Sequence, residues 1–214
     1  MNLKFKLYLY LILFSSIVVF AQCKKDKDED VYNPPDVDEL AFTGAEKTLI
    51  NSNSNDTAMY VMNYFVYADS LILRKQSINV NLNDTTTLFH LIDRMKVTVL
   101  AEGGVGIAAP QVGINRNIIW VQRYDKGSIT NHPWEVYLNP KITKYSDTTK
   151  LMSDGCLSIP GVYQQSVRAI WVDVEYDRPD GSHFAERVKS EYTAHIFQHE
   201  IDHLNGIVFL DRTN

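Results

Sequence analysis

The His-Glu-Ile-Asp-His segment at residues 199–203 constrains the fold of this chain more than any other feature. On a helix, residues four apart lie one turn above each other, so His199 and His203 share a face and can bind one metal ion from the same side. Glu200 lies beside them, where its carboxylate can accept a proton from water activated by the metal. The segment therefore predicts a helix that carries a hydrolytic metal site.

A catalytic site of this type needs a third protein ligand. In one common arrangement a third histidine follows the motif, but Phe209 occupies that position here. In another arrangement an acid follows farther downstream, and within this sequence the only acid after the motif is Asp211. We therefore expect the third ligand to come from an upstream segment of the chain.

Cys156 is the upstream candidate, because its thiolate would complete a Cys-His-His set and leave the fourth position to water. It lies in Ser-Asp-Gly-Cys-Leu-Ser-Ile-Pro-Gly, a segment of loop or strand character. Taken alone, a buried cysteine is more often a small apolar residue without chemistry. The histidine pair makes a metal ligand the favoured interpretation.

A third segment, residues 104–113, reads Gly-Val-Gly-Ile-Ala-Ala-Pro-Gln-Val-Gly. Its first two glycines allow a backbone to approach another group closely, and Gln111 offers an amide donor directly afterwards. A turn that enters a buried strand is the alternative interpretation. No Lys-Ser/Thr pair follows the glycines, so a phosphate-binding loop is not expected.

Together these segments resemble the peptide deformylase family, whose members carry G-x-G-x-A-A-x-Q, E-G-C-L-S and H-E-x-D-H in this order. Here the three motifs read GVGIAAPQ at 104–111, DGCLS at 154–158 and HEIDH at 199–203. The resemblance implies a metallohydrolase that removes the formyl group from N-formylmethionyl peptides. It also implies one divalent metal ion, Fe²⁺ in the family, although Zn²⁺ is compatible with the same ligands.

The resemblance assigns a role to each matching residue. Glu200 would be the general acid and base, and the Gln111 side chain and the Leu157 backbone N–H would hold the developing oxyanion. The metal ligands would be Cys156, His199 and His203, and the residues that line the substrate cleft would be Gly104, Gly106 and Ile107.

One position departs from the family pattern, because Asp154 stands where the family has a glutamate. If this carboxylate pairs with an arginine, for which Arg168 is the candidate, we expect the shorter side chain to shift or weaken the pairing. On the motif helix, His195 lies one turn before His199 and could contact the site. Asp202 is either an ordinary salt-bridged acid or a hydrogen-bonding partner that orients a histidine.

The first forty residues indicate export. Lys4 and Lys6 precede an apolar run at residues 7–21, which is short for a membrane span and typical of a signal peptide. We assign residues 1–22 to a signal peptide and 23–40 to a charged tether. A lipid on Cys23 would anchor the protein to a bacterial membrane, and plain cleavage after Ala21 is the alternative. Outside the cytoplasm, Zn²⁺ would avoid the oxidation that threatens ferrous iron beside a thiolate.

The rest of the chain is predicted to form an extension, residues 41–70, that packs on a deformylase-like catalytic domain, residues 71–214. We expect helices at 41–50, 85–102 and 186–204, strands at 118–121, 135–138 and 170–176, and a turn at 180–181. Thr43 and Glu46 have the spacing of a capping box. These elements predict an α+β fold with a mostly antiparallel sheet around a central metal-binding H-E-x-x-H helix.

Charge and motif content limit the other functional classes. The net charge of −5 and the lack of a basic stripe argue against nucleic acid as a partner. One alternative is a non-catalytic, membrane-tethered module that binds peptide or metal, and another is an amidase for a different N-acyl group. Glu200 and Gln111 favour an enzyme, because metal binding alone needs neither. No feature of the sequence indicates an oligomeric state.

Overall fold

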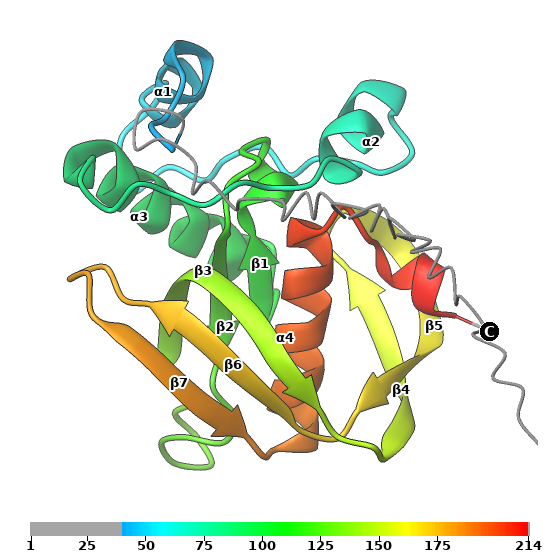
Figure 1. Ribbon diagram of the computed structural model, residues 1–214. Coiled ribbons are helices and arrows are strands. Elements are labelled where there is room, and N and C mark those ends of the chain that lie inside the picture. Colours follow the sequence, from blue (N-terminus) through cyan, green and yellow to red (C-terminus); the bar gives the residue numbers. More distant parts are fainter. Residues whose placement is uncertain (1–39, 214) are drawn as a thin grey trace, which may run out of the picture. The chain divides into compact units, whose positions relative to one another are not determined.

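The computed structural model describes residues 40–213, which form an α+β fold with two antiparallel sheets (Figure 1). The predicted signal peptide and Cys23 lie outside these residues. Within residues 40–213, the structure holds no helix that is long and apolar enough to cross a bilayer. The helices are α1 (Gly44–Ile50), α2 (Tyr67–Leu73), α3 (Thr85–Ala101) and α4 (Glu191–Leu204), with 3-10 helices η1 (Ala109–Val112) and η2 (Phe209–Arg212).

The larger sheet has the strand order β1-β2-β3-β6-β7, and β4 pairs with β5 in a separate two-stranded sheet. All the neighbouring strands are antiparallel. The α+β class and the antiparallel pairing were therefore predicted correctly. The strands are β1 (Gly106–Ala108), β2 (Ile118–Gln122), β3 (Trp134–Tyr145), β4 (Thr149–Cys156), β5 (Ile159–Ala169), β6 (Val172–Asp177) and β7 (His183–Val188).

Alternation along the strands divides the core of the larger sheet into two layers. On one face of the sheet, side chains such as those of Ile118 and Leu138 pack with α3. On the opposite face, side chains such as those of Ile119 and Tyr137 pack with α4. This is the period-two pattern of a sheet that is covered on both faces. The sheet is therefore a fixed wall against which α4 is positioned.

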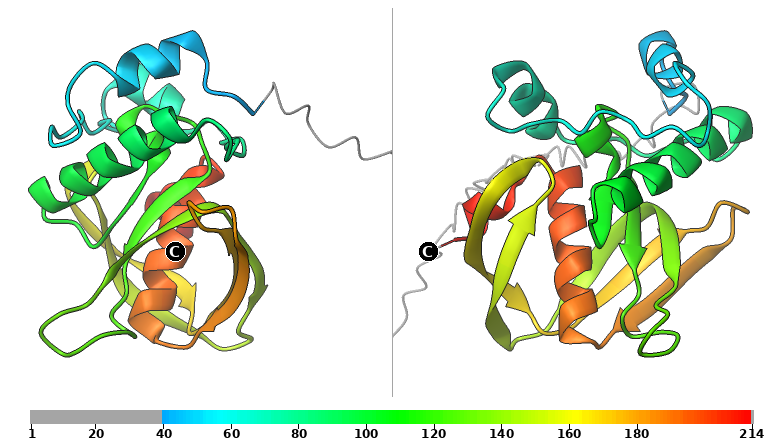
Figure 2. Two further views of the ribbon diagram at one scale, coloured as in Figure 1. Left: turned by 90° about the vertical axis from the view of Figure 1, so that its left-hand side faces the viewer. Right: turned by 180° about the vertical axis from the view of Figure 1, so that it is seen from behind.

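Helix α4 lies between the two sheets, with the larger sheet on one side and the β4–β5 hairpin on the other (Figures 1 and 2). It begins at the N-cap Ser190, whose side chain accepts a hydrogen bond from the Thr193 N–H, and every residue from 193 to 204 is buried. A helix buried on all sides has its polar side chains inside the protein, where each of them needs a partner or a function.

The predicted start of this helix at residue 186 was wrong. Residues 183–188 form β7, which pairs along its length with β6, and the chain turns into the helix only at Ser190. Glu186 and Arg187 favour a helix by local propensity, but the tertiary pairing outweighs that preference. The turn at 180–181 and the strands β2 and β6 lie where the sequence predicted them to within two residues, and β3 extends beyond its predicted range on both sides.

A buried arginine holds the first described residues, which include α1, to the rest of the fold. Arg116 is 1% exposed, pairs with Glu46 of α1 at 2.7 Å and donates to the backbone oxygens of Leu40 and Ala41. The predicted capping box is present, because the Thr43 hydroxyl accepts from the Glu46 N–H while the Glu46 carboxylate accepts from the Thr43 N–H. Glu46 thus closes the first turn of α1 and binds the segment to Arg116.

Candidate metal centre

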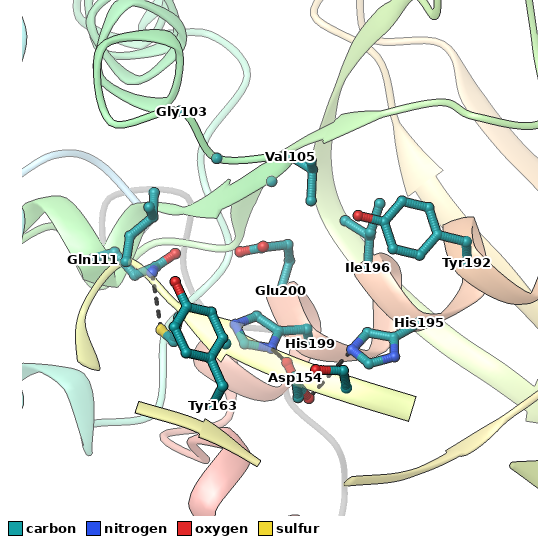
Figure 3. A pocket seen from close by; sticks show the side chains of 16 residues that line it. Gly103, Val105, Gln111, Asp154, Tyr163, Tyr192, His195, Ile196, His199 and Glu200 are labelled. Carbon is teal, nitrogen blue, oxygen red and sulfur yellow. Dashed lines mark hydrogen bonds and ion pairs between the residues drawn. The ribbon is translucent and has the colours of Figure 1, made fainter. Parts of the chain in front are cut away.

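Three side chains from two elements bring metal-binding atoms together beside the cavity shown in Figure 3. Cys156 ends β4, while His199 and His203 lie one turn apart on α4. Their ligand atoms all lie within 4.8 Å of one another, and the Cys156 Sγ is 3.2 Å from Nε2 of His203. The structure therefore brings together the three residues that the sequence singled out, although Cys156 is far from the two histidines in the chain.

The donor set fits a divalent metal ion. His199 donates from Nδ1 to Asp154 at 2.7 Å, which leaves Nε2 as its metal-binding atom. Burial lowers the pKa of His203 well below its ordinary value, so His203 is held in the neutral form that binds metals. One thiolate and two imidazoles with a fourth position open to a cavity are typical of catalytic zinc-type sites.

Asp154 is the centre of a buried hydrogen-bond network. It is 3% exposed and accepts hydrogen bonds from Ser166 at 2.7 Å and from Arg168 at 2.9 Å, in addition to that from His199. The Nε2 atom of His195 lies 3.3 Å from the same carboxylate. Burial alone would raise the pKa of Asp154, but hydrogen bonds from His195 and His199 hold it well below its usual range. The ionised carboxylate therefore orients the His199 ring.

Asp154 pairs with Arg168, the arginine that the sequence suggested as its partner. The two side chains are 2.9 Å apart, and Arg168 is itself only 3% exposed. Arg168 also pairs with Asp202, and Asp202 pairs in turn with Arg212. Asp202 is thus a salt-bridged acid, and Asp154 is the carboxylate that orients His199.

Glu200 is a buried carboxylate next to the three potential ligands. It is 4% exposed, and its Oε2 atom has no hydrogen-bond partner among the described residues. Burial raises the pKa of Glu200 to about 7. A carboxylate with this pKa can both accept and return a proton near neutral pH. A methyl group at Gly106 would lie 2.4 Å from Glu200 Oε1, so only a glycine leaves room for the acid.

Gln111 presents its amide N–H group to the site. Its Oε1 accepts a hydrogen bond from the Ala108 backbone at 2.9 Å, which turns Nε2 toward Ser158 at 3.3 Å and Cys156 at 3.5 Å. Gln111 is 1% exposed and lines the cavity together with Leu157. The amide is therefore a fixed donor beside Cys156.

The cavity has a volume of about 320 Å³, and the two glycines of the first motif, Gly104 and Gly106, line it. The third residue predicted to line the cleft does not. Ile107 is fully buried in the core layer that packs with α3, because strand alternation directs it away from α4. Val105 contributes the apolar side chain of this loop to the cavity instead.

The cavity is also lined by Tyr163, Tyr192 and Ile196, which the sequence did not assign to the cleft, and by His195, which it named as a residue that could contact the site. On α4, Ile196, His195 and Tyr192 precede His199 by three, four and seven residues, which is the spacing of one helix face. That spacing pointed to His195 and could also have identified Tyr192 and Ile196. Tyr163 reaches the cavity through the pairing of β5 with β4, and no local pattern signals it.

Comparison with known proteins gives one consistent family. Residues 62–214 match the family model described as polypeptide deformylase. Peptide deformylase 1 of Bifidobacterium longum is 34% identical over 186 residues, which cover 83% of this chain and 78% of that protein. The peptide deformylase of Chloroflexus aurantiacus is 37% identical over 153 residues, or 67% of this chain and 81% of that protein.

A solved structure shares the fold over most of the described residues. The crystal structure of a class I type b peptide deformylase from Acinetobacter baumannii with bound Met-Ala-Ser has a TM-score of 0.65 and 34% sequence identity. The match covers 73% of this chain and 99% of that chain.

Proposed function

Because this chain belongs to the polypeptide deformylase family, we propose that it hydrolyses the N-formyl group of N-formylmethionyl peptides with Glu200 as the proton carrier. The observation that carries this proposal is the set of Cys156, His199 and His203 beside a buried carboxylate that lacks a partner among the described residues. The enzyme class is a metallohydrolase. The bond broken is the linear amide between the formyl carbon and the peptide nitrogen.

We assign the metal to Cys156, His199 and His203. A divalent ion supplies two effects when it is bound, since it makes water a stronger acid and polarises a carbonyl group. Fe²⁺ is the usual ion of the family, and Zn²⁺ fits the same donors. Asp154 keeps His199 oriented for this role through the Nδ1 hydrogen bond.

Glu200 moves the proton in both halves of the proposed reaction. It takes one proton from the attacking water as the water oxygen bonds to the formyl carbon. It then gives that proton to the peptide nitrogen as the carbon–nitrogen bond breaks, which yields a free amine and formic acid, and the formic acid ionises to formate in water. Its pKa of about 7 suits both transfers, because neither protonation state is strongly disfavoured near neutral pH.

Gln111 and Leu157 are proposed to hold the negative charge that develops on the formyl oxygen. The fixed Nε2 group of Gln111 and the backbone N–H of Leu157 both belong to residues that line the cavity. Each such donor contributes roughly a hundredfold or more in rate when it is positioned before the reaction. The Ala108 hydrogen bond supplies that positioning for Gln111.

The proposed substrate is tested with formyl-Met-Ala-Ser and acetyl-Met-Ala-Ser. We expect the metal-loaded protein to release formate from the first peptide and little acetate from the second, because the cavity of about 320 Å³ is narrow around Gly106 and Glu200. Glu200→Ala should retain metal and release neither. Acetate release as the main activity would indicate a different acyl group, and metal binding without either product would indicate a non-catalytic module.

We also propose that the protein is exported and carries a lipid on Cys23. The charged start and the apolar run at residues 7–21 support export, and Lys24 to Asp30 resemble the hydrophilic tether of bacterial lipoproteins. Cell fractionation tests this proposal, since Cys23→Ser should move the protein from the membrane fraction to the soluble fraction. Metal analysis of protein isolated from membranes then decides between Zn²⁺ and Fe²⁺.

A further inference from the structure

Helix α2 and the two residues before it carry large apolar side chains that the described fold leaves uncovered. Tyr67 is 79% exposed, Phe65 63% and Leu71 57%, and Val66 is exposed as well. We call these four residues the α2 patch. Single exposed apolar side chains are ordinary on a protein surface, whereas several that adjoin one another mark a site of interaction.

The helix does not need these side chains for its own packing. Leu73 is the one residue of α2 that is buried. Two positions along a helix correspond to a rotation of about 200°, so Leu71 points almost directly away from Leu73 and from the core. Tyr67 lies one turn before Leu71 and shares its outward face. The patch is therefore directed outward by the geometry of the helix.

Hydrogen bonds around a single acid hold the residues before α2 in place. Asp69 accepts from the Tyr60 hydroxyl at 2.9 Å and from the Asn63 N–H at 2.8 Å, and the Asn63 side chain accepts from the Phe65 N–H at 3.0 Å. Within residues 57–73, Asp69 is the only charged side chain. The patch is thus formed before any partner arrives, and covering it would desolvate little charge.

The predicted tether joins the fold at the end of the molecule where α2 lies. Helix α1 begins at Gly44, close after the tether, and α1 and α2 lie at one end of the molecule, whereas the loop that joins β2 to β3 lies at the opposite end (Figures 1 and 2). The stretch from Cys23 to Leu40 can span at most about 60 Å and averages about 25 Å when it is flexible. A lipid on Cys23 would therefore keep this end of the fold near a bilayer.

We propose that the α2 patch rests on the surface of the phospholipid bilayer that holds the anchor at Cys23. This inference rests on the proposed export and lipid, and it goes beyond the proposed reaction. Phe65 and Leu71 offer apolar surface to the boundary of the acyl chains, and Tyr67 has the apolar ring and polar hydroxyl group that suit the level of the lipid headgroups. Because the tether keeps the patch close to the bilayer, a weak contact is enough to orient the protein.

The test introduces a tryptophan into the patch of the full-length, lipid-anchored protein. In vesicles of brominated phosphatidylcholine, we expect the tryptophan added by Leu71→Trp to lose about half of its fluorescence, because a ring at the interface is within reach of the bromine atoms. The signal of the three native tryptophans is subtracted with the unaltered protein. Ile129→Trp is the matched control, because Ile129 is 94% exposed in the β2–β3 loop and should not be quenched.

Phe65→Trp should be quenched like Leu71→Trp, and it decides the matter if the latter variant does not fold. Equal quenching at positions 71 and 129, or none at position 71, would overturn the proposal. A dimer in solution that Leu71→Ser dissociates would assign the patch to a second copy of this chain and would overturn it too.

Failure of the earlier proposals gives separate results. A chain whose mass shows no lipid on Cys23 removes the anchor on which this inference rests, and the inference falls with it. The rate of formate release from formyl-Met-Ala-Ser in solution should be the same in Leu71→Trp, Phe65→Trp and the unaltered protein, because the patch lies outside the cavity. Absence of formate from all three would contradict the proposed reaction and leave the quenching result valid.

Discussion

Gly106 and Glu200 lie so close that a single methyl group on the glycine would be 2.4 Å from the carboxylate oxygen. The same methyl group would lie 2.9 Å from the Ile196 side chain. Glu200 is buried on α4, and the helix is packed on both sides, so the acid cannot move away freely. The first glycine motif therefore makes room for Glu200 of the third motif, the proposed proton carrier.

Gly106→Ala should displace the Glu200 carboxylate and lower kcat/KM at least a hundredfold, because proton transfer depends on its position. Metal content should stay close to one ion per chain, since the three atoms nearest to the added methyl group belong to Glu200 and Ile196 and not to a proposed ligand. Gly44→Ala, where nothing lies within 4 Å, is the control. Activity above a tenth of the original in Gly106→Ala would contradict this reading of the contact.

The stability of the metal-free protein should depend on the ionisation of Glu200. Burial raises its pKa from 4.5 to about 7, so the folded state binds the proton more tightly than the unfolded chain. That contribution is present below pH 4.5 and is lost as the pH rises through 7. Glu200→Gln removes the ionisation and should stabilise the metal-free protein at pH 8 by up to about 3 kcal/mol. Denaturant unfolding at pH 5 and pH 8 measures the difference, and equal effects at both pH values would refute it.

Asp154→Asn should weaken metal binding roughly 10–100-fold, because the His199 ring loses the carboxylate that orients it. It should also destabilise the protein by about 3 kcal/mol, since Arg168 loses one of its two buried ion-pair partners. Competition with a chelator measures the affinity, and chemical unfolding measures the stability. Ser166→Ala, which removes one neutral donor to Asp154, should have a much smaller effect on both.

Lys96→Met should stabilise the protein at pH 7. The Lys96 Nζ atom is buried without a hydrogen-bond partner among residues 40–213, and it lies 3.6 Å from the centre of the Trp134 ring. Burial lowers its pKa from 10.5 to about 8, so the charged form is disfavoured in the folded state. We expect a melting temperature a few degrees higher for the variant at pH 7, with the advantage shrinking between pH 8 and pH 10.5 as the lysine loses its charge. A lower melting temperature at pH 7 would show that the lysine–tryptophan contact outweighs burial.

The periodic parts of the fold could be predicted from the sequence. The apolar spacing of residues 85–102 identified α3 to within one residue, and the four-residue spacing of His199 and His203 placed them on one helix face. The family resemblance is confirmed by the match to the family model. The metal ligands and the roles of Glu200 and Gln111 stay proposals, as do the signal peptide and the lipid.

Features that depend on contacts between segments far apart in the chain could not be predicted from the sequence. Local propensity favoured a helix at Glu186, but hydrogen bonds to β6 make it part of a strand. The arrangement around Asp154 joins β4, β5 and α4, and no local pattern of the sequence contains it. Ile107 was placed in the cleft because its neighbours match a motif, whereas strand alternation directs its side chain into the core. In each instance the missing information is which elements become neighbours.

The division of the proposed ligands between a hairpin and a helix gives the ion a mechanical role. Cys156 and His203 are 47 positions apart in the chain, and a shared ion would link the C-terminal end of β4 to the buried helix. Such a link restricts the unfolded chain in the same manner as a disulfide bond that closes a loop of similar length. Removal of the ion by a chelator would then affect the stability of the protein as well as its turnover. It would remove that added stability, and the pairs of Arg168 with Asp154 and Asp202 would be left to hold the hairpin to α4.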